Sequence, residues 1–165
     1  MATKTLIVLR HAKSSWQTTE PDQRRPLSDR GERDAVAAGR ILAGFELGVV
    51  LASTATRVQQ TWEGAQAGGA GCRDVRTSEM IYHAWANELL AELHELDEAT
   101  HTALLIGHQP TLSDLIVGLA KPSGLTEKVA AKFPTCGLAV LTYRGAWKTL
   151  ADGKADLKRF EIPRG

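Results

Sequence analysis

The 165-residue chain lacks several features that would point to a special class of protein. Its only two cysteines, Cys72 and Cys136, lie far apart, so the sequence predicts two reduced, packed thiols in a cytoplasmic protein rather than a disulfide framework. No charge sign dominates, because 20 Lys+Arg face 19 Asp+Glu for a net charge of +1. Such a chain has no global field to attract nucleic acid or an anionic membrane, and any anion must be bound by a local cluster.

Long apolar runs are also missing. The run at residues 6–9 ends in Arg10 and is too short for the core of a signal peptide. No segment approaches the roughly 20 apolar residues that cross a bilayer. Repeats, low-complexity tracts and linkers are absent as well. We therefore expect one domain over residues 1–165, located in the cytoplasm, with no membrane or nucleic-acid partner. The sequence leaves its oligomeric state open.

The segments that are present alternate between strand-like and helix-like patterns. Compact runs rich in Leu, Ile and Val predict buried strands at residues 5–9, 49–52, 103–106 and 137–143, with weaker strands at 74–77 and 160–162. Apolar spacing predicts helices at residues 29–42, 54–66, 89–96 and 110–119, and loops at 11–26 and 121–134. Ser28 or Asp29 is expected to cap the first helix, and Ser53 or Thr54 the second.

Strands separated by helices predict an α/β protein with a mostly parallel sheet, covered on both faces as a three-layer αβα sandwich. In such sheets ligands bind beyond the carboxyl ends of the strands. Three predicted strands deliver basic side chains there, namely Arg10 with His11, Arg57 just after Ser53, and His108 after Gly107. Helix N-termini nearby also favour anions. Each motif alone would suit an ordinary loop, but their coincidence predicts a phosphate site.

These segments resemble known motifs. Arg10-His11-Ala12-Lys13-Ser14 resembles the "RHG" signature of the histidine phosphatase (phosphoglycerate mutase-like) superfamily, with alanine where glycine is usual. The stretch S-x-x-x-R-x-x-Q-T from Ser53, the Gly-His-Gln-Pro run at 107–110 and R-P-L-S-x-x-G from Arg25 are similar to further family motifs, in the family's order. The short length and the Arg-His-Ala-Lys-Ser start look most like the SixA-type phosphohistidine phosphatase branch.

The resemblance implies roles for individual residues. His11 would be the nucleophile that forms a phosphohistidine intermediate, and Arg10, Arg57 and His108 would hold the phosphate oxygens. Ser14, Gln17 and Arg25 would also contact the phosphate or the substrate; Gln17 stands where larger members often carry asparagine. Glu79, in Glu-Met-Ile-Tyr, resembles the acid of larger members, whereas the small branch often dispenses with this acid; an exposed carboxylate is the competing interpretation.

The residue types agree with that chemistry. An imidazole has a free ring nitrogen near pH 7, and a guanidinium fork binds phosphate bidentately. Because the protein supplies its own positive charge, we expect no cofactor and no metal; the remaining histidines, including His83, form no metal-ligand spacing. Lys13 and His83 could line the site or simply lie at the surface. Four tryptophans are expected as core or pocket walls: Trp16, Trp62, Trp85 and Trp147.

Three functions remain to be compared. The leading one is a metal-independent phosphatase that removes phosphate from phosphohistidine in a protein or from a small phosphoramidate. The second is a phosphomonoesterase or mutase of the same superfamily acting on a small metabolite, although this chain has no room for the long insertions that usually close over such substrates. The third is a phosphate-binding module without turnover, which the presence of His11 argues against.

Overall fold

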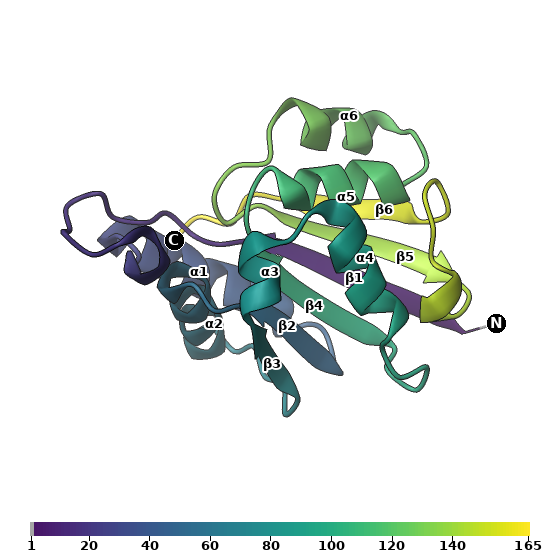
Figure 1. The fold of residues 1–165 in the computed structure, drawn as a ribbon, viewed down its shortest axis with the longest axis horizontal. Coiled ribbons are helices and arrows are strands. Elements are labelled where there is room, and N and C mark those ends of the chain that lie inside the picture. The colour runs from purple at the N-terminus through teal and green to yellow at the C-terminus, as the bar shows by residue number, and fades with distance from the viewer. Residues whose placement is uncertain (1) are drawn as a thin grey trace.

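Six strands form one sheet in the order β3-β2-β4-β1-β5-β6 in the computed structural model, which describes residues 2–165 (Figure 1). The strands are β1 (Thr3–Arg10), β2 (Val49–Ser53), β3 (Val75–Ser78), β4 (Thr102–Gly107), β5 (Leu138–Arg144) and β6 (Asp156–Glu161). β3, β2, β4 and β1 are parallel, whereas β5 and β6 join antiparallel at one edge. The predicted mostly parallel sheet is confirmed.

Helices cover both faces of the sheet (Figure 1). On one face lie α1 (Asp29–Leu42) and α2 (Thr56–Ala67); on the other lie α3 (Glu79–His83), α4 (Ala86–His94), α5 (Thr111–Leu119) and α6 (Gly124–Ala131). Two short 3₁₀ turns are η1 (Asp22–Arg24) and η2 (Trp147–Thr149). Among the described residues, no helix has the length and apolarity that crossing a bilayer requires.

Alternate residues of β1 serve the two faces, as the period of two in a strand dictates. Leu6 and Val8 pack in the cluster beneath α4, α5 and α6. Ile7 and Leu9 pack in a second cluster beneath α1 and α2. The central strand is therefore buried on both sides, which confirms the three-layer sandwich.

The start of α1 also positions the loop that follows β1. Ser28 caps α1 as predicted, because its side chain accepts a hydrogen bond from the Gly31 amide at 3.1 Å. Ser28 in turn donates its backbone N–H to the Lys13 carbonyl at 2.9 Å. A Cβ at Gly31 would lie 2.0 Å from that carbonyl oxygen, so only glycine permits this close approach. The loop is thereby fixed against the helix.

Several expectations about local structure were wrong. The segment expected as loop at 121–134 contains α6, capped by Ser123; with only Leu125, Val129 and two alanines, the helix lacks a strong apolar stripe. Neither Ser53 nor Thr54 caps α2; its N-cap is Ala55, which makes no side-chain capping bond. The last strand begins at residue 156 rather than 160.

The four tryptophans differ in burial, so the expectation of core or pocket-wall positions holds for only some of them. Trp62 and Trp147 are buried, as expected of core residues. Trp85 is 71% exposed at the start of α4 and is neither core nor pocket wall. Trp16 is 76% exposed and forms part of a pocket wall described below. Both cysteines are free, with Cys136 buried.

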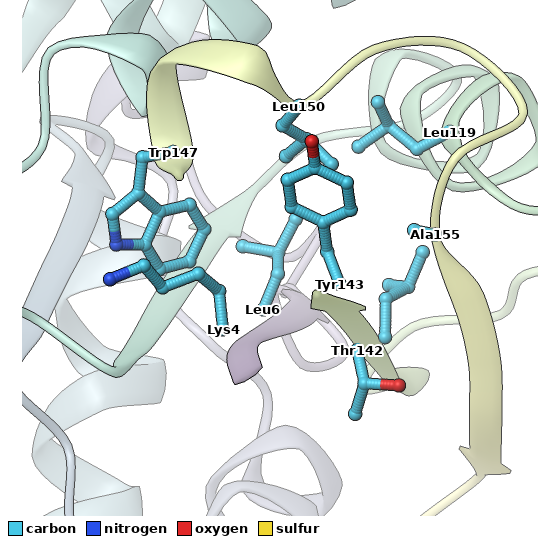
Figure 2. Close-up of a pocket in the computed structure, with 9 residues that line it drawn as sticks. Lys4, Leu6, Leu119, Thr142, Tyr143, Trp147, Leu150 and Ala155 are labelled. Carbon is cyan, nitrogen blue, oxygen red and sulfur yellow. The ribbon is translucent and has the colours of Figure 1, made fainter. Parts of the chain in front are cut away.

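At the amino-terminal end of β1, the structure encloses a small, mostly apolar cavity (Figure 2). Lys4 and Trp147 flank one side of it in the view, and Leu119 and Ala155 the other. Its free volume is about 10 Å³, roughly the space of one water molecule. The cavity is therefore a packing defect of the core rather than room for a ligand.

Candidate active site

At the opposite end of the sheet lies an open pocket of about 200 Å³. It forms where β1, β2 and β4 end side by side, as expected for a parallel sheet. The residues that line it are Arg10, His11, Lys13, Ser14, Trp16, Arg25, Arg57, His108, Gln109 and Thr135. The structure thus brings together the four basic residues that the strand ends predicted.

His11 is buried at the floor of this pocket and is 7% exposed. Its Nδ1 lies 2.7 Å from the Ala12 carbonyl oxygen, which can only accept, so Nδ1 carries the proton and Nε2 keeps a free lone pair. Burial is the main cause that lowers the pKa of His11 to about 3; the charges of His108, Arg57 and Arg10 act in the same direction, and the hydrogen bond to Ala12 acts against them. At neutral pH His11 is therefore an uncharged ring suited to nucleophilic attack.

Arginine guanidinium groups surround His11. Arg10, the last residue of β1, donates through Nη1 to the Phe133 carbonyl at 3.1 Å. Arg57, in the first turn of α2, is 6% exposed and donates through Nη1 to the Asp22 carbonyl at 2.7 Å. The Nε atoms of Arg10, Arg25 and Arg57 are all buried without a hydrogen-bond partner. Because buried donors are nearly always paired, three unpaired arginine donors around one pocket indicate a site built for an anion.

His108 completes the ring of polar groups, with its centroid 5.5 Å from that of His11. Its Nε2 lies 2.8 Å from Ser53 Oγ, and its Nδ1 lies 3.5 Å from Arg57 Nη2. Since Arg57 can only donate, Nδ1 is the acceptor and Nε2 donates to Ser53. Burial, with the charge of Arg57 second, lowers the pKa of His108 to about 4, so this ring is also neutral at pH 7.

One threonine ties the nucleophile loop to α2. Thr61 Oγ1 accepts the Ala12 amide at 3.0 Å and donates to the Arg57 carbonyl at 2.7 Å. Ala12 is fully buried. Thr61 thereby fixes the backbone next to His11 relative to the backbone of Arg57.

Asp22 and Tyr82 were missed by the sequence analysis. Asp22, on η1, pairs with Arg57 at 3.1 Å and with Arg25 at 3.4 Å, and accepts a hydrogen bond from the Tyr82 hydroxyl. The Tyr82 hydrogen bond contributes most to a fall in the pKa of Asp22 to about 2, so this carboxylate is ionised. Asp22 was missed because two of its three partners, Arg57 and Tyr82, come from distant segments.

Three predicted contacts lie on the loop after β1. Ser14 is buried and accepts a hydrogen bond from Arg25 Nη1. Arg25 is 8% exposed, lines the pocket, and stacks over the Trp16 ring at 3.7 Å. Gln17, in contrast, is exposed and lies outside the pocket, facing a neighbouring hollow. The structure therefore brings Ser14 and Arg25 to the site and leaves Gln17 beside it.

The remaining candidates lie at the margin. Glu79, the first residue of α3, is exposed and does not line the pocket. His83 is exposed too and packs against the edge of Tyr82, which in turn contacts His108 edge-on. Lys13 is exposed at the pocket wall. Within residues 2–165, no three His, Cys, Asp or Glu side chains converge in a way that could hold a metal ion.

Comparison with known proteins agrees with this geometry. Residues 6–110 match the family model described as histidine phosphatase superfamily (branch 1). The chain belongs to the histidine phosphatase superfamily. It is also 38% identical to the uncharacterized protein Rv1276c of Mycobacterium tuberculosis, over 94% of this chain and all of that protein.

Solved structures place the chain in the SixA-type branch of this superfamily. A SixA-type protein from Nakamurella multipartitia matches with a TM-score of 0.88 and 31% identity, covering 99% of this chain and 98% of that one. A second, from Agrobacterium tumefaciens, matches with a TM-score of 0.82 and 28% identity, covering 97% and 98%. These relatives support a phosphatase, and hence a phosphorylated substrate.

Proposed function

We propose that this histidine phosphatase removes phosphate from phosphohistidine, in a protein or in a small phosphoramidate, and that it needs no metal. The observation that carries the proposal is the composition of the pocket wall, which holds arginines, histidines and a lysine but no carboxyl group among the described residues. The nearest carboxylate in the network, Asp22, has a pKa of about 2 and carries no proton to give at neutral pH.

The missing acid matters because leaving groups differ in basicity. An alkoxide is strongly basic and needs a proton in the transition state, usually from a positioned carboxylic acid. The imidazole of phosphohistidine is far less basic, with a conjugate acid near pH 6.5. It leaves as a neutral molecule when its second ring nitrogen already carries a proton. A site without a protonated carboxyl group therefore suits the P–N bond better than the alkyl P–O bond.

In the first step, His11 Nε2 attacks phosphorus in line with the leaving nitrogen. The bond from phosphorus to the substrate imidazole breaks, a bond to His11 forms, and the released electron pair stays on the leaving nitrogen. Arg10 and Arg57 neutralise the charge on the equatorial oxygens through their unpaired donors. His108 contributes a further hydrogen bond to these oxygens once its ring turns from Ser53 to the phosphate.

In the second step, water attacks the phosphorus of phospho-His11, and inorganic phosphate leaves. The electron pair of the P–N bond returns to His11 Nε2, and the water proton passes to a phosphate oxygen. His11 keeps its Nδ1 proton through the cycle because the Ala12 carbonyl holds it. The ring is thus ready for the next substrate without any change of tautomer.

A substrate panel tests the proposal. We expect kcat/KM for 3-phosphohistidine and phosphoramidate to exceed that for alkyl phosphates by a hundredfold or more, with equal rates in EDTA. Vanadate should inhibit, because it mimics the pentacoordinate phosphorus. A preference for alkyl phosphates would favour the metabolite phosphatase. Activity that EDTA removes and one added metal restores would contradict the metal-free mechanism, and phosphate binding without turnover would indicate a binding module.

Glu79→Gln separates the two enzymatic functions. If the leaving group needs no acid, we expect less than a tenfold loss on aryl and alkyl phosphates, about 1.4 kcal/mol, and almost no change on phosphoramidates. Glu88→Gln is the matched control, since Glu88 is an exposed carboxylate at the start of α4. A loss of a hundredfold or more on alkyl phosphates would identify Glu79 as a working general acid.

A further inference from the structure

The rim of the pocket carries an exposed aromatic ring that the proposed reaction does not yet use. Trp16, on the loop after β1, is 76% exposed, although a large apolar side chain is normally covered. Trp16 lines both the pocket around His11 and an adjoining hollow of about 540 Å³. Trp16 therefore borders both the proposed phosphate site and the open surface beside it.

The ring is held by a fixed partner rather than left free. The Arg25 guanidinium lies 3.7 Å from the ring centroid and covers one face of the indole. Arg25 itself is anchored by Ser14 Oγ, by the Ser15 carbonyl at 3.4 Å and by Asp22 at 3.4 Å. Because Arg25 is 8% exposed and held at several points, the indole that stacks on it is preorganised.

The chemistry of the leaving group fits this surface. With the phosphate between Arg10, Arg57 and His11, the rest of the substrate must extend outward past the rim. The imidazole of phosphohistidine is flat, and it is cationic when its second ring nitrogen is protonated. Flat rings stack on indoles, and cations are attracted to the electron-rich indole face. Ammonia, the leaving group of phosphoramidate, has no ring to stack.

We propose that Trp16 is a specificity-determining residue whose indole forms the platform for the leaving imidazole of phosphohistidine. This inference rests on the proposed function. It adds that the enzyme recognises the imidazole ring of the substrate as well as the phosphate. Stacking selects a planar ring on phosphorus and holds it in line with His11. The open hollow beyond Trp16 leaves space for the chain that carries the histidine.

Trp16→Ala and Trp16→Phe test the platform on two substrates, 3-phosphohistidine and phosphoramidate. We expect Trp16→Ala to lower kcat/KM for 3-phosphohistidine about tenfold, mainly through KM. The value for phosphoramidate and the inhibition constant of vanadate should stay within twofold. Trp16→Phe should recover most of the loss, since a phenyl ring still stacks. Trp85→Ala is the matched control, because Trp85 is 71% exposed and outside the pocket.

Three results would overturn the platform: equal losses on both substrates, weaker vanadate inhibition, or no change at all. The first two would mean that Trp16 acts only by holding Arg25 against the phosphate. Failure of the proposed function is seen separately, in the wild-type enzyme, as a preference for alkyl phosphates over both P–N substrates. If the wild-type enzyme prefers P–N substrates but Trp16→Ala affects 3-phosphohistidine and phosphoramidate equally, the platform is contradicted and the proposed function is not.

Discussion

The two ends of β1 each carry a cationic side chain, Lys4 and Arg10, but the surroundings of the two differ. At the amino-terminal end, Lys4 is 4% exposed, donates to the Glu98 carbonyl and pairs with the Glu98 carboxylate at 3.6 Å. The cavity beside it has space for about one water molecule (Figure 2). At the carboxyl-terminal end, Arg10 keeps an unpaired buried Nε and faces an open pocket of about 200 Å³.

The difference separates stability from function within one strand. A buried charge costs several kcal/mol unless partners compensate for it, and at Lys4 the protein supplies those partners itself. At Arg10 and Arg57 the compensation is incomplete, because the buried Nε atoms have no partner, and we propose that a bound anion supplies it. Substitutions at the two ends should therefore have different readouts, folding at Lys4 and turnover at the pocket.

The largest expected effect is at the pocket floor. His11→Ala should lower turnover by several powers of ten and abolish trapping of a phosphoenzyme, because the attacking nitrogen is gone. At pH 5 the unfolded wild-type chain gains a proton on His11 that the folded chain does not bind, which destabilises the fold. His11→Ala removes this effect, so urea unfolding at pH 5 should show a variant at least as stable as wild type. Near-wild-type activity in this variant would refute His11 as the nucleophile.

Arg57 should come next. Arg57→Ala should lower kcat/KM by about 30- to 1000-fold, as expected for a preorganised donor worth about 2–4 kcal/mol. Arg57→Lys should restore only part of the loss, because one ammonium group cannot make the bidentate contact. Steady-state kinetics on one phosphoramidate would measure both variants. A lysine variant as active as wild type would disprove the argument from fork geometry.

A smaller effect should appear in the pH dependence of folding. Below pH 6.5 the unfolded chain protonates His11, whereas the folded chain does so only near pH 3, so stability must fall as the pH drops through this window. The slope for His11 is about 1.4 kcal/mol per pH unit.

Urea titrations between pH 6.5 and 4.5 would therefore show a shallower decline in His11→Asn than in wild type. His101→Asn, at an exposed position, should decline as wild type does. Parallel curves for all three proteins would contradict the low pKa of His11.

The smallest effect is expected at Lys4. Lys4→Met keeps a buried aliphatic side chain and removes the charge that Glu98 compensates. We therefore expect an unfolding free energy within about 1.5 kcal/mol of wild type. Its kcat/KM should stay within twofold. The matched substitution at the other end, Arg10→Met, should cost at least a hundredfold in turnover. Loss of turnover in Lys4→Met would remove the distinction between the two ends.

The predicted strand ends located most of the site residues, and there is a physical reason for this success. Parallel strands with apolar cores align their carboxyl ends, so Arg10, His11, Arg57 and His108 could be placed together from the runs that precede them. Asp22 could not, because its importance arises largely from contacts with Arg57 and Tyr82, which come from other segments. Helix α6 was missed for a similar reason: its local pattern is weak, and packing on α5 and β6 supports it.

The helix caps also show that residue type and spacing alone do not decide the role of a side chain. Ser28 has the residue type and the spacing of a cap, and it caps α1. Ser53 has an equally suitable type and spacing, yet its hydroxyl accepts the Ala55 amide and the Nε2–H of His108. A hydroxyl at the end of a strand can serve the next helix or the site, and only tertiary structure decides between them.

The ion pair between Asp22 and Arg57 has a consequence for product release. Inorganic phosphate left in a pocket of three arginines would be held tightly, and the enzyme would be slowed by its own product. The Asp22 carboxylate offsets one positive charge and competes for Arg57 Nη2, which weakens the hold on a free phosphate ion. Under the proposed function, Asp22 therefore favours release of the product over its retention.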